Sequence, residues 1–283
     1  MITQTVNVLG LKLPKIDPRW WLIINHITLV SLGLIAYDMR RSAVQVGFAF
    51  ACGILSEILF SAVTRKQVFF SIRDRLMSAT ILCSATIILV RAEDWWFYGL
   101  MAVIGVASKY LLVNDKGRHL FNPTNFAVVF AVMVMPLYLQ FRPDTFSASW
   151  VPMAVILCFA GMATITAKSW RAPLAYMGTI FLVGLPLGMM LGYHPVRVIG
   201  PEISVTTLLF CLAAMTDPQT SPRAPKQQLL YGSLIALVAL FLRYNEVYYH
   251  QFVALFVVTC LNSVLFSSPG LPPQQQQQIG TKG

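Results

Sequence analysis

Long apolar runs separated by short polar connections dominate this sequence. A helix needs about 20 residues to cross the hydrocarbon core of a bilayer, and about 17–25 are tolerated. Ten runs approach this length, and we predict a membrane-spanning helix in each: 20–37, 44–63, 75–91, 95–113, 124–141, 150–167, 173–193, 203–216, 227–243 and 247–266. The eighth run is short and lies between Pro201 and Pro218, so we expect a broken or re-entrant segment there. The pattern predicts an all-α, polytopic membrane protein.

The same runs define the domain organisation. We expect a cytoplasmic N-tail over residues 1–19, one transmembrane domain over 20–266, and a C-terminal tail over 267–283. A Pro-Gly pair, a Pro-Pro pair and five consecutive glutamines predict that this last tail is disordered. Ten spans divide into two halves of five, about 20–141 and 150–266, and we expect these halves to be inverted repeats.

Composition supports a membrane location. Of the 283 residues, 57% are hydrophobic and only 11% are charged, whereas a soluble globular protein carries about 25% charged residues. This deficit excludes a water-soluble enzyme, a disordered protein and a disulfide-stapled secreted domain. The five cysteines lie in separate apolar runs and form no C-x-x-C pair, so we expect no metal site.

The net charge of +10 indicates membrane topology rather than nucleic-acid binding, because the basic residues lie in short connections. Fourteen of the 21 Lys and Arg residues fall in the two tails and in the loops after spans 2, 4, 6 and 8, and six fall in the other loops. Loops rich in Lys and Arg face the cytoplasm. We therefore predict a multi-pass protein of the plasma (inner) membrane with both termini cytoplasmic.

Two polar motifs interrupt the apolar pattern on this predicted cytoplasmic side. F-N-P-T-N lies at 121–125, between spans 4 and 5, and T-D-P-Q-T-S-P lies at 216–222, between spans 8 and 9. Proline ends a helix, and the polar residues around it can cap the next one. Two interpretations are open: ordinary helix stops and N-caps, or paired breaks that line a central site. The second makes eight residues candidates for ligand binding: Asn122, Pro123, Thr124, Asn125, Asp217, Pro218, Thr220 and Ser221.

Ionisable residues inside predicted spans are further candidates, because a charge within a membrane is costly and is usually paired or functional. Glu57 lies in span 2, Lys109 lies toward the cytoplasmic end of span 4, and Asp217 lies at the mouth of span 8. We expect Lys109 to pair with Glu57 or with Asp217, or alternatively to snorkel to the interface. The four scattered histidines are expected to be interfacial or capped residues rather than metal ligands, and no catalytic residue can be named.

Several of these segments resemble one membrane-protein family. The run M-T-D-P-Q-T-S-P-R-A-P-K-Q-Q-L-L-Y-G-S-L, which begins at Met215, resembles the T-D-P-V-T-S/A and following R-x-I-Y/F-G-x-L pattern of the NqrB/RnfD subunits. The run K-Y-L-L-V-N-D-K-G-R-H-L-F-N-P-T-N-F, which begins at Lys109, resembles that family's glycine-rich N-P-F-N-P segment. Upstream, Glu57 and the pair Arg65-Lys66 resemble its A-E-A … L-R-K pattern. The resemblance extends from about residue 45 to 266.

The resemblance implies a flavin-associated membrane subunit of an electron-transport complex, which couples electron transfer to transmembrane transport beside partner subunits in the lipid bilayer. In such a complex the chain would be a flavin-carrying or non-catalytic subunit of an oxidoreductase. Family members carry covalent FMN on a threonine in the loop between the halves. The corresponding loop here is short, and Thr145 lacks the Gly-Ala-Thr context. We therefore expect no covalent FMN and instead non-covalent FMN or riboflavin at the two motifs.

Two functions of other classes remain open. One is a stand-alone transporter or channel for a small polar solute, because the family's five-plus-five spans resemble those of urea transporters. The other is a cofactor-free structural subunit of a membrane complex. The sequence supports no nucleic-acid partner for any of the three.

Overall fold

The computed structural model describes residues 5–8, 11–14, 16–64, 72–92, 94–113, 119–141, 146, 149–218 and 220–265. Helices make up about 77% of it, and the described residues form only two short two-stranded sheets. The predicted helical class is confirmed. Thr145, the pair Arg65-Lys66 and the C-terminal tail over 267–283 lie outside the described residues.

Five helices form the first half of the chain: α1 (Pro18–Ile35), α2 (Ala43–Val63), α3 (Ile72–Leu89), α4 (Trp96–Leu111) and α5 (Pro123–Val134). The second half is more broken, with π-helices at η2 and η4 and a 3-10 helix at η3. They are α6 (Trp150–Thr166), α7 (Arg171–Thr179), η2 (Ile180–Gly184), α8 (Leu185–Met190), α9 (Pro195–Ile199), η3 (Gly200–Glu202), α10 (Val205–Leu209), η4 (Phe210–Ala214), α11 (Pro225–Tyr244) and α12 (His250–Leu265).

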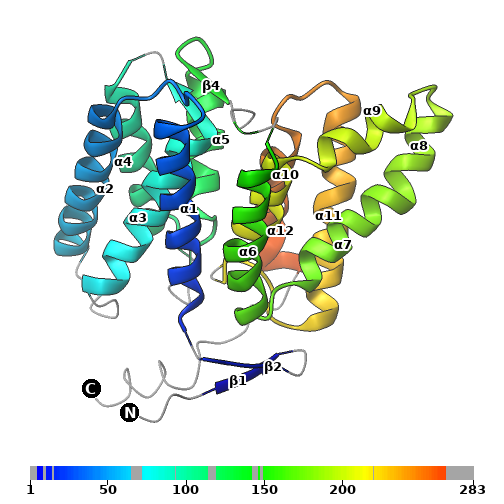
Figure 1. The fold of residues 1–283 in the computed structure, drawn as a ribbon, viewed down its shortest axis with the longest axis horizontal. Helices are drawn as coiled ribbons and strands as arrows, with labels where there is room; N and C mark the ends of the chain where they lie inside the picture. Colours follow the sequence, from blue (N-terminus) through cyan, green and yellow to red (C-terminus); the bar gives the residue numbers. More distant parts are fainter. Residues whose placement is uncertain are drawn as a thin grey trace.

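Two segments depart from the predicted organisation. The fifth apolar run is not one helix to residue 141, because α5 ends at Val134 and β4 (Leu139–Phe141) pairs antiparallel with β3 (Val90–Ala92). Pro136 explains this end, since proline disfavours helical geometry in the residue before it. The N-tail also contains structure, as β1 (Thr5–Val8) and β2 (Leu11–Pro14) form an antiparallel pair near the start of α1 (Figure 1).

Helix length and composition support part of the predicted topology. Within the described ranges, α2, the continuous α7–α8 segment and α11 are long and apolar enough to cross a membrane. A fourth candidate is the pair α9–η3 and α10–η4, which is bent by 48° at a break after Glu202. The broken eighth segment is thus confirmed. Helix length supports three or four spans, and the full set of ten stays a prediction.

The two halves pack in the same pattern. In the first half α2 packs on α4, α1 on α3, and α4 on α5; in the second half α7 packs on α11, α6 on α10 and η4, and α11 on α12. Across the boundary α1 packs on α6, and α5 packs on α12. Figure 1 shows the two groups side by side, with α1 to α5 on the left. The boundary between the halves is therefore the surface on which a central site can form.

The α7–α11 contact shows how closely these helices approach. A Cβ built on Gly232 of α11 would lie 2.2 Å from the carbonyl oxygen of Ala172 in α7. Only glycine allows backbones this close, which is a common use of small residues between membrane helices. Beside this contact, the fully buried rings of Tyr176, Phe210 and Tyr231 belong to the main hydrophobic core.

Candidate functional site

A cavity of about 640 Å³ lies between the halves at the end of the bundle where α1 begins, and we call it the vestibule. Its walls come from the first turns of α1 and α3, the start of α5, the α6–α7 turn and the segment between η4 and α11. Six of the eight sequence-predicted binding residues line it: Asn122, Pro123, Thr124, Asp217, Pro218 and Ser221. The two motifs, 95 positions apart in the chain, thus contribute to one cavity.

The first motif ties the halves together. The Asn122 side chain caps α5 by accepting a hydrogen bond from the Asn125 backbone N–H at 3.1 Å, and its Nδ2 donates across the boundary to the Ala214 carbonyl at 3.2 Å. Asn125 is buried behind the vestibule, where its Nδ2 donates to the Phe252 carbonyl at 3.2 Å. At Asn122 both interpretations therefore apply, since it is an N-cap and it lines the cavity.

The second motif is a tight turn rather than a helix cap. The Asp217 carbonyl accepts from the Ser221 backbone N–H at 2.9 Å and from the Ser221 hydroxyl at 2.7 Å. The Thr220 hydroxyl donates to Asp217 Oδ2 at 3.2 Å, which places Thr220 behind the wall. Helix α11 begins later, after Ala224, with no side-chain cap. The interpretation of this motif as the N-cap of the next helix is therefore wrong, because α11 begins only after Ala224 and the Thr220 and Ser221 hydroxyls bond inside the turn.

The π-helix η4 shapes the wall between the motifs. Its Leu212 carbonyl accepts hydrogen bonds from the hydroxyls of Thr164 and Thr216, both at 2.9 Å. Ala213, the next residue, lines the vestibule, and the carbonyl of Ala214 accepts the hydrogen bond from Asn122 Nδ2. Single turns of π-helix are frequent at functional sites because they redirect side chains and carbonyls within a helix.

Charged side chains of both signs line the vestibule. Arg19 forms ion pairs with Asp17 at 2.6 Å and with Asp74 at 2.5 Å, and so links the start of α1 to α3. Burial acts to raise the pKa of the Asp17 carboxyl, but hydrogen bonds from the Arg19 side chain and backbone and the Arg19 charge hold it below its ordinary value of 3.8. Lys168 and Arg223 lie on the opposite wall. Sequence reasoning treated these bases only as markers of topology.

Glu57 and Lys109 form a buried ion pair between α2 and α4. Lys109 Nζ donates to Glu57 Oε1, and the Tyr110 hydroxyl donates to Glu57 Oε2 at 2.7 Å. The two charged side chains are only 2% and 4% exposed. The expected Glu57–Lys109 pairing is present, and the alternative that Lys109 snorkels is wrong. Lys109 also lines the inner side of the vestibule.

A second buried charge cluster lies at the opposite end of the molecule, and sequence reasoning missed it. Glu202, only 1% exposed, accepts hydrogen bonds from Arg243 Nη1 at 3.1 Å, Gln251 Nε2 at 3.1 Å and the Tyr176 hydroxyl at 3.4 Å. Arg243 lies in the last turn of α11, as Lys109 lies in the last turn of α4. Each half therefore carries one buried carboxylate that is paired with a basic residue in the last turn of a helix, α4 in the first half and α11 in the second.

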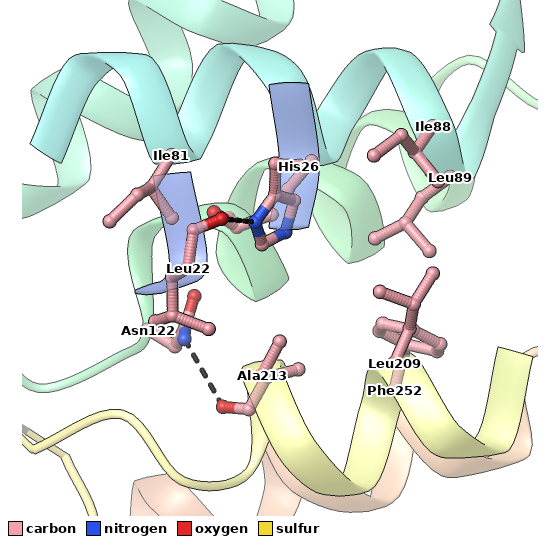
Figure 2. A pocket seen from close by; sticks show the side chains of 12 residues that line it. Leu22, His26, Ile81, Ile88, Leu89, Asn122, Leu209, Ala213 and Phe252 are labelled. Carbon is pink, nitrogen blue, oxygen red and sulfur yellow. Dashed lines mark hydrogen bonds between the residues drawn. The ribbon is translucent and has the colours of Figure 1, made fainter. Parts of the chain in front are cut away.

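A narrower cavity of about 40 Å³, which we call the inner slot, adjoins the vestibule. The two share Leu22, Ile81, Asn122, Thr124 and Ala213 in their walls. Figure 2 shows apolar side chains of α1, α3, η4 and α12 around the slot, with the His26 ring among them. His26 is only 3% exposed and lies midway along α1, so of its two expected states, interfacial or capped, the interfacial one is wrong.

Comparison with known proteins does not identify the chain. No protein-family model matches it, and no curated protein matches it. Among the described residues no group of three or more His, Cys, Asp or Glu side chains is placed to hold a metal ion.

Proposed function

We propose that this chain is an RnfD/NqrB-like membrane subunit of an electron-transport complex, and that it holds a flavin non-covalently in the vestibule. The observation that carries the proposal is the construction of the vestibule. Both motifs that resemble the family, F-N-P-T-N and T-D-P-Q-T-S-P, contribute to its walls at the boundary between the halves.

The residues of the vestibule fit such a ligand in size and chemistry. Cofactor and drug-sized ligands occupy pockets of about 300–1,000 Å³, and 640 Å³ falls within this range. The wall includes Gln228, whose Nε2 donates to the carbonyls of Lys168 and Arg223 while its buried Oε1 has no partner among the described residues. All of Lys168, Arg223, Asn122 and Ser221 line the cavity. In this proposal Lys168 and Arg223 would hold the phosphate of FMN, and Asn122 and Ser221 would bond polar ring atoms.

In this proposal the chain's own task is to bind and orient the cofactor and to shield it from water. A bound flavin supplies the electron-transfer chemistry. The apolar slot behind the vestibule closes the cavity on its inner side, and the Arg19 ion pairs fix the α1 and α3 walls. The chain thereby provides a site open on one side.

The proposed topology places the mouth of the vestibule in the cytoplasm. Arg19, Lys168 and Arg223 belong to the set of basic residues that predicts the cytoplasmic side. The repeated packing of the two halves and the opposite positions of their buried ion pairs support an inverted repeat of five spans each. In this arrangement α3 and the α9–α10 pair are the third spans of the two halves, and of these two only the α9–α10 span is broken.

A small-solute transporter is the second candidate, because a one-sided cavity between two inverted halves is also the form of an inward-open transporter. The size of the vestibule favours a larger ligand than urea. Flux of radiolabelled urea into proteoliposomes separates the two candidates. The flavin proposal predicts the same uptake as in protein-free liposomes, and a saturable uptake above that level would favour transport.

The flavin proposal is tested by purifying the protein and measuring its visible absorbance, its acid-extractable flavin and any flavin fluorescence in a denaturing gel. We expect extractable flavin and a dark gel band. Asp217→Asn should lower the flavin content severalfold, while Asp94→Asn, an exposed aspartate outside the vestibule, should not. Absence of flavin from the wild-type protein, together with failure to bind added riboflavin or FMN, would refute the proposal and leave a cofactor-free subunit.

A further inference from the structure

The His26 ring lines the inner slot, and its Nε2 is the nitrogen free to bind a ligand there. The other ring nitrogen, Nδ1, lies 2.7 Å from the Leu22 carbonyl oxygen in the preceding turn of α1. A carbonyl oxygen can only accept a hydrogen bond, so Nδ1 must carry the hydrogen. In the neutral ring Nε2 is then an acceptor, and it bonds to no other described residue. Figure 2 shows the ring held against Leu22 on the wall of the slot.

The slot also contains a donor. The Thr124 hydroxyl lies in the wall shared by the slot and the vestibule, and it makes no hydrogen bond to another described residue. The rest of the wall is largely apolar, with Ile88, Leu89 and Phe252 among its residues. Both residues line the slot, so a ligand that hydrogen-bonds to both groups gains affinity and specificity.

The geometry points to His26 as the specificity residue of the vestibule. We infer that the edge of the ligand's ring enters the slot and that His26 accepts a hydrogen bond from an N–H on this edge. This inference rests on the proposed function. The matching chemistry is a planar heterocycle in which an imide N–H lies beside a carbonyl, so that His26 Nε2 accepts from the N–H and the Thr124 hydroxyl donates to the carbonyl. The slot, at about 40 Å³, admits only the edge of such a ring, and the remainder occupies the vestibule.

The inference is tested by titrating the detergent-purified protein with riboflavin and with N3-methylriboflavin, and following the quenching of flavin fluorescence. The methyl group removes the imide N–H and enlarges the edge that enters the slot. Wild-type protein should bind riboflavin about tenfold more tightly than the methylated form, which corresponds to about 1.4 kcal/mol and to one hydrogen bond. Equal affinity for the two flavins in the wild-type protein would overturn the inference.

Two substitutions locate this preference at His26. His26→Leu removes the acceptor and should weaken riboflavin binding about tenfold, with loss of the preference over N3-methylriboflavin. His26→Gln keeps an acceptor oxygen and should retain part of the preference. His194→Gln is the matched control, because His194 is an exposed N-cap of α9 that lies outside both cavities.

The outcomes separate this inference from the proposed function. If wild-type protein binds neither flavin, both are refuted. If it binds riboflavin and His26→Leu binds it equally well, or still rejects the methylated form, only the role of His26 is refuted. Gel filtration and thermal unfolding of each variant establish that it is folded. If a variant fails to fold, the comparison of the two flavins in wild-type protein alone tests whether the site reads the imide N–H.

Discussion

Substitution of Lys109 by methionine should destabilise the protein strongly. The change removes the cation and leaves the Glu57 carboxylate 2% exposed, with the Tyr110 hydroxyl at 2.7 Å as its remaining hydrogen-bond donor from this cluster. Breaking a buried ion pair in this way costs about 3–5 kcal/mol, because an uncompensated charge stays out of water. Neither side chain is exposed enough for solvent screening to reduce this value.

The double variant Glu57→Gln/Lys109→Met should recover most of the lost stability. It leaves a neutral pair of similar volume, and the amide oxygen introduced at position 57 can still accept from Tyr110. Replacement of a buried ion pair by neutral residues of similar size is often close to neutral in stability. The two single substitutions should therefore be strongly non-additive, with a coupling of about 3 kcal/mol, the upper end of the range for residues in contact.

Thermal unfolding in detergent, followed by the loss of the monodisperse gel-filtration peak, measures these changes. At about 2–4 °C per kcal/mol for a chain of 150–250 residues, Lys109→Met should lower the midpoint by on the order of 10 °C. Asp38→Asn is the matched control, because the Asp38–Arg40 pair is 3.8 Å long and its side chains are 85% and 66% exposed. A Lys109→Met midpoint no lower than that of Asp38→Asn, or a double variant as unstable as the sum of the singles, would refute the reasoning.

Two further substitutions test the packing of the second half by the same unfolding assay. Gly232→Ala should lower the midpoint by several degrees, because its Cβ would meet a backbone carbonyl of α7 at 2.2 Å, whereas Gly178→Ala, with no atom within 4 Å of its added Cβ, should be neutral or slightly stabilising; equal midpoints for the two variants would contradict the close α7–α11 contact. Arg243→Met should destabilise the protein about as much as Lys109→Met, because it leaves the Glu202 carboxylate buried at 1% exposure without its ion-pair partner. If Arg243→Met unfolds at the same midpoint temperature as the wild-type protein, the buried cluster contributes nothing to stability.

Hydropathy predicts the helices well because each apolar run must bury or cover its surface. All ten predicted runs contain helix, and the proline-flanked eighth run is broken as expected. The errors lie where local chemistry overrides hydropathy. Pro136 ends α5 inside an apolar run, and β4 then pairs with β3, a segment 49 positions away that no local pattern reveals.

The candidate site was predictable where a local rule applied. The N-P-T-N motif indicated the Asn122 cap, and the cost of an intramembrane charge indicated a partner for Glu57. The partners of Glu202 and the environment of His26 depend on which helices meet, and the sequence does not contain that information. Arg243 and Gln251 could have been suspected only from the rule that a buried carboxylate needs donors, once Glu202 was placed inside the bundle.

The central claim, a flavin site in a cytoplasm-facing vestibule between the halves, is tested most directly by cysteine protection in oriented membrane vesicles. With the native cysteines replaced by alanine, Ser78→Cys places a thiol on the α3 wall of the vestibule, and Thr64→Cys places one at the end of α2, outside it. We predict that a membrane-impermeant maleimide labels both from the cytoplasmic side only, and that riboflavin slows labelling at position 78 but not at position 64. Labelling of position 78 from the opposite side, or at the same rate with and without riboflavin, would contradict the account.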